Sequence, residues 1–157
     1  MIIHILSDKI SGVSLEYIER IGHYCKIYGG AGNFDFKKFA DGFDAQKDVL
    51  ICVVSEGKSE LSSEDFAAKI KGFLVAGVKN LYFTIEGIYA DKLDRILGGA
   101  GSKNHNAANV NNGPLKKIEV EKISFSSVKV SEKMLSAMLA EQIYRAFKII
   151  NNETYHK

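Results

Sequence analysis

The chain has 157 residues, of which 46% are hydrophobic, with 21 Lys and Arg against 19 Asp and Glu. This length and composition are typical of one globular domain, residues 1–157, with a substantial core. The formal net charge of +2 permits RNA binding but is too small for a dedicated basic RNA binder acting as a single chain. If the partner is an RNA, the rest of the binding interaction must come from a dimer that doubles the basic face or from a preformed ribosomal surface.

The sequence indicates neither a membrane segment nor a metal centre. No run approaches the roughly 18 apolar residues of a membrane span, and residues 1–4 lack the basic region of a signal peptide. We therefore expect a cytoplasmic location and no membrane partner. Cys25 lies in a helical pattern and Cys52 in a strand pattern, which favours reduced thiols over a disulfide or a structural metal.

The first third of the chain predicts a strand, a helix and a loop. Residues 2–6 form a short apolar run, and residues 7–12 a turn. Helical spacing then runs from a cap at Ser14 to about Ile27. Residues 29–47 have no sustained period, and they leave open a short strand at 34–36 or a turn of helix at 37–39. The expected buried stripe of the helix is Leu15, Ile18, Ile21, Cys25 and Tyr28.

The middle of the chain alternates strands with helices. Residues 49–54 and 81–85 are apolar runs typical of buried parallel strands. Between them, Ser62 and Asp65 predict a capping box, with Phe66, Ala67, Ile70, Phe73 and Leu74 facing inward. A helix at about 89–97 should follow. This alternation predicts an α/β fold with a mainly parallel sheet and helices on both faces.

The last third begins with a segment rich in Gly and Asn, residues 98–114, which has little to bury and predicts a flexible excursion. Residues 118–120 and 123–125 alternate as strands do. Ser131 then caps a long amphipathic helix that runs into a polar tail. Its expected buried positions are Met134, Leu135, Met138, Leu139, Ile143, Ala146, Phe147 and Ile150. Gln142 falls within this stripe, so its amide should find partners.

Three expected strand ends, residues 53–57, 85–87 and 125–130, mark where a ligand would bind, because ligands of open parallel sheets lie outside the carboxyl ends of strands. A glycine there, Gly87, allows close backbone approach. The chain has no P-loop and no convincing G-x-G-x-x-G. A flavodoxin-like nucleotide-binding domain that uses the same strand ends stays open as a distant alternative.

Two ordered blocks resemble one known family. Residues 140–146 read Ala-Glu-Gln-Ile-Tyr-Arg-Ala, and the chain closes with Tyr155-His156-Lys157. Upstream, residues 56–58 read Glu-Gly-Lys, and residues 61–67 read Leu-Ser-Ser-Glu-Asp-Phe-Ala. Together they resemble the ribosomal RNA large subunit methyltransferase H family of SPOUT methyltransferases. The resemblance is best over residues 49–87 and from 123 onward.

The resemblance implies a fold and a set of site residues. The fold would be SPOUT-like with a C-terminal trefoil knot, in a homodimer. S-adenosylmethionine would be the cofactor, and the residues implied to bind it are Val53, Gly87, Phe125, Ser126, Ser127, Val128, Lys129 and Val130. Arg145, Tyr155 and His156 would orient the target base and accept or relay its proton, with the tail entering the partner subunit's pocket. The implied target is a ring nitrogen of a pseudouridine in large-subunit ribosomal RNA, presented on the assembled ribosome.

Two places in the sequence depart from the family pattern. Glu86 stands where the family has a glycine, and Ser131-Glu132 stands where it has Pro-His. A carboxylate in the glycine loop supports an alternative: a non-catalytic RNA-binding or ribosome-binding paralogue that has lost the cofactor. The helix residues Glu141, Gln142 and Tyr144 are assigned first to packing or to the dimer face.

Overall fold

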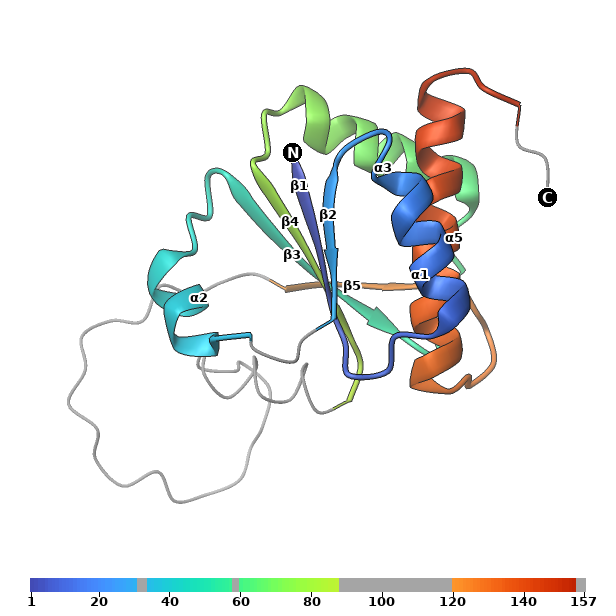
Figure 1. Cartoon of the computed structure of the whole chain (residues 1–157), viewed down its shortest axis with the longest axis horizontal. Helices are drawn as coiled ribbons and strands as arrows, with labels where there is room; N and C mark the ends of the chain where they lie inside the picture. Colours follow the sequence, from blue (N-terminus) through green and yellow to red (C-terminus); the bar gives the residue numbers. More distant parts are fainter. Residues whose placement is uncertain (31–33, 58–59, 88–119, 155–157) are drawn as a thin grey trace.

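A computed structural model describes residues 1–30, 34–57, 60–87 and 120–154 of the chain. Its centre is a sheet in the order β2-β1-β4-β3-β5, in which every pairing is parallel (Figure 1). The five strands are β1 (Ile2–Leu6), β2 (Lys26–Gly29), β3 (Asp48–Val54), β4 (Asn80–Ile85) and β5 (Val120–Ser124). The predicted parallel sheet is confirmed.

The described helices are α1 (Gly12–Ile21), α2 (Phe36–Gly42), α3 (Ser63–Val75) and α5 (Glu132–Ile150). Ser62 and Ser131 cap α3 and α5 as predicted, each accepting a hydrogen bond from the backbone N–H three residues on. The Gln142 amide also finds partners, because its oxygen accepts from the Ser63 hydroxyl and its nitrogen donates to Glu141. The hydrogen bond from Ser63 to Gln142 joins α5 to the first residue of α3.

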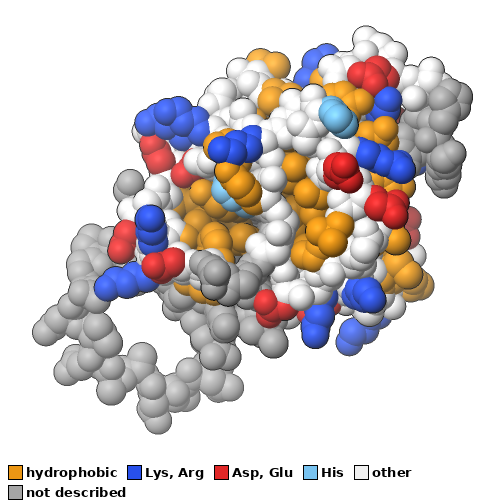
Figure 2. All heavy atoms as spheres, in the orientation of Figure 1, with side chains coloured by type: hydrophobic (Ala, Val, Ile, Leu, Met, Phe, Trp, Pro, Cys, Tyr) orange, Lys and Arg blue, Asp and Glu red, His pale blue; other side chains and the backbone are white. Residues whose placement is uncertain are grey.

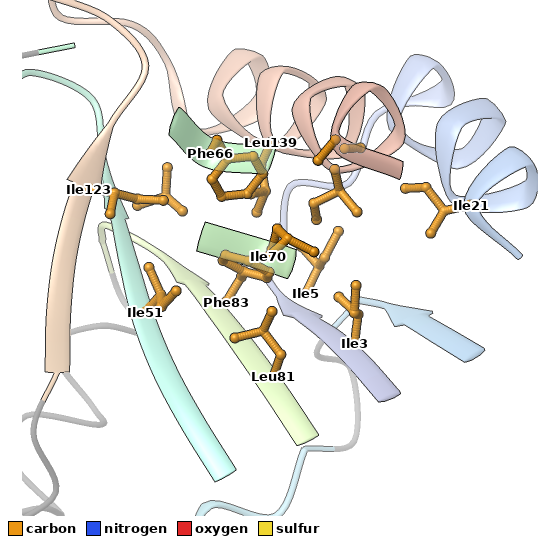
Figure 3. Packing of buried hydrophobic residues seen from close by; sticks show 14 of the residues in the cluster. Ile3, Ile5, Ile21, Ile51, Phe66, Ile70, Leu81, Phe83, Ile123 and Leu139 are labelled. Atoms are coloured by element: carbon orange, nitrogen blue, oxygen red, sulfur yellow. The ribbon is translucent and has the colours of Figure 1, made fainter. Parts of the chain in front are cut away.

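The main core lies between one face of the sheet and the helices α1, α3 and α5 (Figure 3). Alternate strand residues point into it, as the two-residue period of a strand requires. Each helix contributes one apolar stripe. The fully buried large side chains of this core include Ile3, Ile5, Ile21, Ile51, Phe66, Ile70, Leu81, Phe83 and Leu135.

The opposite face of the sheet carries a second, smaller cluster under α2. Phe39 and Phe43 pack there against Leu6 and Leu50, and the Phe39 ring meets Tyr82 edge-on at 4.8 Å between centroids. Helices therefore cover both faces, as predicted. The α2 helix also resolves the choice left open at 34–39 in favour of a helix.

The prediction for residues 14–28 was wrong in two respects. The helix begins earlier, because Ser11 is the N-cap and forms a capping box with Ser14. It ends at Ile21, and Lys26–Gly29 form β2, whose residues pair in register with Ile2–Ile5 of β1. Pairing with β1, 24 residues away in sequence, makes residues 26–29 a strand despite their local helical spacing.

Four residues expected to face inward are exposed: Leu15 at 55%, Tyr28 at 48%, Leu74 at 37% and Met134 at 54%. Leu15, Leu74 and Met134 lie in the first or last turn of their helices, and Tyr28 lies in β2, an edge strand of the sheet. The predicted helix at 89–97, the excursion at 98–114 and the strand residues 118–119 lie outside the described residues. Among the described residues, no helix has the length and apolar character needed to cross a membrane.

Candidate cofactor and catalytic site

The carboxyl ends of four strands meet at one edge of the sheet. Residue pairs Leu6–Thr84, Val53–Ile85 and Val54–Ser124 are in register across β1, β4, β3 and β5. Beyond the last pair of β3 and β4, the Glu86 N–H donates to the Val53 carbonyl at 2.9 Å. The three predicted ligand-binding ends are thus brought together, together with the end of β1.

Gly87 gives this edge its most open backbone. Its φ of +124° lies where residues with a side chain are strained. A Cβ built there would meet the Glu132 carboxylate, with Oε2 at 3.7 Å. A glycine is therefore needed here for its backbone conformation, and the space beside it faces α5.

Glu132 is the first residue of α5 and turns toward the strand ends. The Ser7 hydroxyl, just beyond β1, donates to Glu132 Oε1 at 3.3 Å. Ser7 is buried, at 1% exposure. A carboxylate at a helix N-terminus is also stabilised by the helix dipole. Glu132 is consequently held between β1 and Gly87.

The segment between β5 and α5 folds as a series of serine turns. The Ser126 N–H donates to the Ser124 hydroxyl, and the Val128 N–H donates to the Ser126 hydroxyl. The Gly57 N–H donates to the Ser126 carbonyl at 3.3 Å, and the Leu61 N–H to the Ser124 carbonyl at 2.8 Å. These bonds hold the segment 125–130 against the loop that follows β3.

Glu60 adds a charged link between the same two loops. Its carboxylate accepts a hydrogen bond from the Ser127 N–H at 2.7 Å. Hydrogen bonding from the Ser127 side chain, and then from its backbone, lowers the pKa of the Glu60 carboxyl. The carboxylate therefore stays ionised at neutral pH.

The residues predicted to bind the cofactor divide into two kinds. Val53 is fully buried in the main core, and the Phe125 ring packs edge-on against Phe66 at 5.1 Å between centroids. Val128 and Lys129 are exposed. Val53 and Phe125 would therefore offer backbone groups to a ligand. The exposed side chains of Val128 and Lys129 could turn toward the ligand.

Arg145, one of the three predicted catalytic residues, is not at this edge. Arg145 is half-buried on α5, 13 positions beyond Glu132, which corresponds to roughly 20 Å along the helix axis. Figure 1 shows that α5 begins beside the strand ends and finishes at the far end of the molecule. Tyr155 and His156 lie outside the described residues. Within one chain, therefore, Arg145 and Gly87 are not brought together.

Sequence reasoning missed three polar residues at the strand edge. The sequence pattern places Ser7 in a turn and marks Glu132 only as a departure from a family pattern, and it assigns no role to Glu60. Ser7 and Glu132 could have been found from the rule that polar groups next to strand carboxyl ends and helix N-termini form sites. The Glu60 contact with Ser127 spans 67 positions and had no local signal.

Comparisons with known proteins agree with this architecture. A family model described as "Predicted SPOUT methyltransferase" matches residues 112–156. A "Ribosomal RNA large subunit methyltransferase H" of Natranaerobius thermophilus is 33% identical over 112 residues, which cover 71% of this chain and 57% of that protein. The protein of the same name from Mycoplasmopsis agalactiae is 27% identical over 158 residues, covering 97% of this chain and 93% of the relative.

These findings support a class and then a family. The family match supports the SPOUT methyltransferase class, with which the parallel sheet is consistent. Within that class, the names of its relatives support the ribosomal RNA large subunit methyltransferase H family. The aligned segment spans little more than half of some relatives, 57% for Natranaerobius thermophilus and 58% for a Ruegeria species.

The residues at the strand edge fit the methyl donor of this class. S-adenosylmethionine carries a sulfonium and an ammonium, both positive. The edge offers a glycine with open backbone at 87 and the carboxylate of Glu132 beside it, and the Glu60 carboxylate lies against Ser127 of the neighbouring loop. In the described part of the chain, Thr84 Oγ1 is also buried without a hydrogen-bond partner, so β4 has a polar group to offer near its end.

Proposed function

We propose that this protein methylates large-subunit ribosomal RNA with S-adenosylmethionine as the donor. The observation that carries the proposal is the edge where β1, β3, β4 and β5 end, with Gly87 open and Glu132 turned toward it. The names of its relatives support the class of substrate. The trefoil knot is part of this proposal, because it belongs to the resemblance.

When bound, the cofactor supplies an electrophilic methyl group on a positively charged sulfur. Backbone groups of residues 86–87 and 125–130 would hold it, and Val53 would form the floor. The carboxylate of Glu132 would face its positive charge. Because Ser7 already fixes one oxygen of Glu132, that side chain needs little further ordering on binding, which favours affinity.

The nucleophile is a ring nitrogen of the target base, by resemblance that of a pseudouridine. This nitrogen would gain the methyl group that the donor supplies and would lose its proton. His156 has a side chain whose ordinary pKa suits acceptance of that proton. Tyr155 and Arg145 would orient the base by stacking and hydrogen bonding.

A homodimer would complete the site. The distance of roughly 20 Å along α5 between Glu132 and Arg145 separates the two halves of the chemistry within one chain. A tail donated to the partner subunit would join them. The RNA partner also favours a larger surface, because Lys and Arg are interspersed with Asp and Glu on the visible face rather than gathered in one basic patch (Figure 2). The assembled ribosome is the proposed form of the substrate.

The test is transfer of labelled methyl from S-adenosylmethionine into ribosomes that lack this modification. Wild-type protein should incorporate label, and Tyr155→Phe and His156→Ala should incorporate much less. Glu86→Gly should retain activity. If wild type is inactive but Glu86→Gly gains activity, the cofactor loop has decayed. Absence of incorporation by every variant, with ribosome binding intact, would favour a non-catalytic binding paralogue.

A further inference from the structure

We propose that Lys148, Glu153 and Tyr24 form an anchor that fixes the direction in which the C-terminal tail leaves α5. They would be positioning residues for Tyr155 and His156. This inference rests on the proposed function of the tail. It concerns residues that neither the family match nor the sequence pattern assigns to the site.

The anchor converges on a single carboxylate oxygen. Lys148 Nζ lies 2.7 Å from Glu153 Oε2, and the Tyr24 hydroxyl donates to the same oxygen at 2.8 Å. Lys148 comes from the last turn of α5, whereas Tyr24 comes from the turn between α1 and β2. The contact joins residues 129 positions apart, so the beginning and the end of the chain meet there.

The backbone reinforces this side-chain contact. Asn151 is the C-cap of α5, and Asn152 has a φ of +55°, the left-handed conformation that Asn tolerates better than most residues. The Asn152 N–H donates to the Ile149 carbonyl, and the Glu153 N–H donates to the Lys148 carbonyl at 2.8 Å. This is the Schellman pattern of helix termination. Glu153 is therefore tied to Lys148 through both backbone and side chain.

Tyr24 is itself held rigidly. Its ring stacks on Phe147 with centroids 5.5 Å apart and planes 7° apart, and Phe147 is buried at 4% exposure. A second aromatic contact reaches Tyr144 at 6.2 Å. Because two rings of α5 fix the Tyr24 ring, its hydroxyl marks a defined point on the surface. The carboxylate of Glu153, two residues before Tyr155, is drawn to that point.

The anchor is better explained by positioning than by stability. Exposed ion pairs generally add little to folding, and the Glu153 side chain is 43% exposed. The chain offers a matched control in Lys69 and Glu121, also 2.7 Å apart, with exposures of 27% and 46% against 19% and 43% for Lys148 and Glu153. That pair links α3 to β5, away from the tail. A purely structural role predicts similar consequences for both pairs.

The experiment measures methyl transfer to ribosomes by Glu153→Gln, Tyr24→Phe and Lys148→Met, with Lys148→Arg as the conservative variant and Glu121→Gln as the control. We expect kcat to fall about tenfold in Glu153→Gln, which is less than the roughly hundredfold loss that a misplacement of about 1 Å can cause. Lys148→Arg should recover most of the rate lost in Lys148→Met. Affinity for S-adenosylmethionine, measured by calorimetry, should not change.

Nuclear magnetic resonance of the free protein gives a second readout. Backbone amides of residues 153–157 should shift and gain mobility in Glu153→Gln but not in Glu121→Gln. If the wild-type protein transfers methyl groups and Glu153→Gln has the same kcat, the anchor proposal is wrong while the proposed function stands. Absence of transfer by wild type would overturn the proposed function, and with it the catalytic purpose of the anchor. The two failures are therefore distinguishable.

Discussion

The two ends of α5 make polar contacts with different parts of the molecule, while the face between them that meets the core is mostly apolar. At the first turn, Glu132 accepts a hydrogen bond from Ser7 beside the strand ends. At the last turn, Lys148 binds Glu153, which also accepts from Tyr24. Between them, the helix buries Leu135, Leu139, Ile143 and Ala146 completely. One rigid element thus separates a proposed cofactor end from a proposed tail end.

This difference shows how the fold and the site can be altered independently. The buried centre holds the helix by apolar packing, which is where most folding free energy arises. The polar contacts at the ends are exposed or partly buried, so they fix positions more than they stabilise. Substitutions in the centre should therefore change stability, and substitutions at either end should change only the function of that end.

The largest effect is expected at the centre. Leu139→Ala removes a fully buried side chain from the main core and should lower the free energy of unfolding by about 2–5 kcal/mol. Chemical denaturation of the purified protein measures this. Met134→Ala on the same helix, at 54% exposure, is the matched control and should change stability much less. Equal losses in the two variants would contradict the assignment of the buried face.

The centre of α5 was also the part most readable from sequence. Its three- and four-residue spacing and its Ser131 cap are local signals, as is the continuous apolar run of β3. The strand β2 was not predictable in this way, because four residues gain their structure from pairing with β1. Tertiary pairing overrode local spacing there.

The site was predictable only in part, for a related reason. Gly87 and the segment 125–130 follow strands, so the strand-end rule finds them. The contacts of Ser7 with Glu132 and of Tyr24 with Glu153 join residues 125 and 129 positions apart. No spacing pattern encodes such pairs, since they depend on how the sheet order brings the ends of the chain together.

The next largest effect is expected at the proposed cofactor end. Gly87→Ala forces a side chain into a backbone with φ of +124°, at a cost of roughly 1–3 kcal/mol. If the loop relaxes to avoid that strain, the affinity for S-adenosylmethionine should fall about tenfold or more. Calorimetric titration of the cofactor measures the change.

Two glycines serve as controls for this substitution. Gly77→Ala introduces comparable backbone strain, because its φ is +74°, but it follows α3 and lies away from the carboxyl ends of the strands. Gly72→Ala lies within α3 with open space around it, where alanine favours the helix by about 1 kcal/mol. Both should keep cofactor affinity. Loss of affinity in Gly77→Ala as well would mean that strain anywhere disturbs the site.

A smaller effect is expected for Glu132→Gln, which removes a charge and keeps the shape. Affinity for S-adenosylmethionine should fall about threefold to tenfold, because charge-assisted contacts are roughly twice as strong as neutral ones. The neutral product S-adenosylhomocysteine should lose less if the carboxylate faces the sulfonium. Glu64→Gln, also in the first turn of a helix, controls for the helix dipole. Unchanged affinity for both ligands would remove Glu132 from the site.

The smallest expected effect is a pH response at the tail end. Hydrogen bonds from Lys148 first, and from Tyr24 second, lower the pKa of the Glu153 carboxyl from its ordinary value of 4.5. A depressed pKa means that the anchor is fully present above pH 4.5 and is lost only as the pH falls through the lowered value. Tail amide shifts should therefore stay constant from neutral pH to 4.5 and change at more acidic pH, while circular dichroism reports whether the fold persists. Glu153→Gln should show no such change, because it has no carboxyl to protonate. A transition centred above pH 4.5 in the wild type would show that Lys148 and Tyr24 do not hold the carboxylate in its charged form.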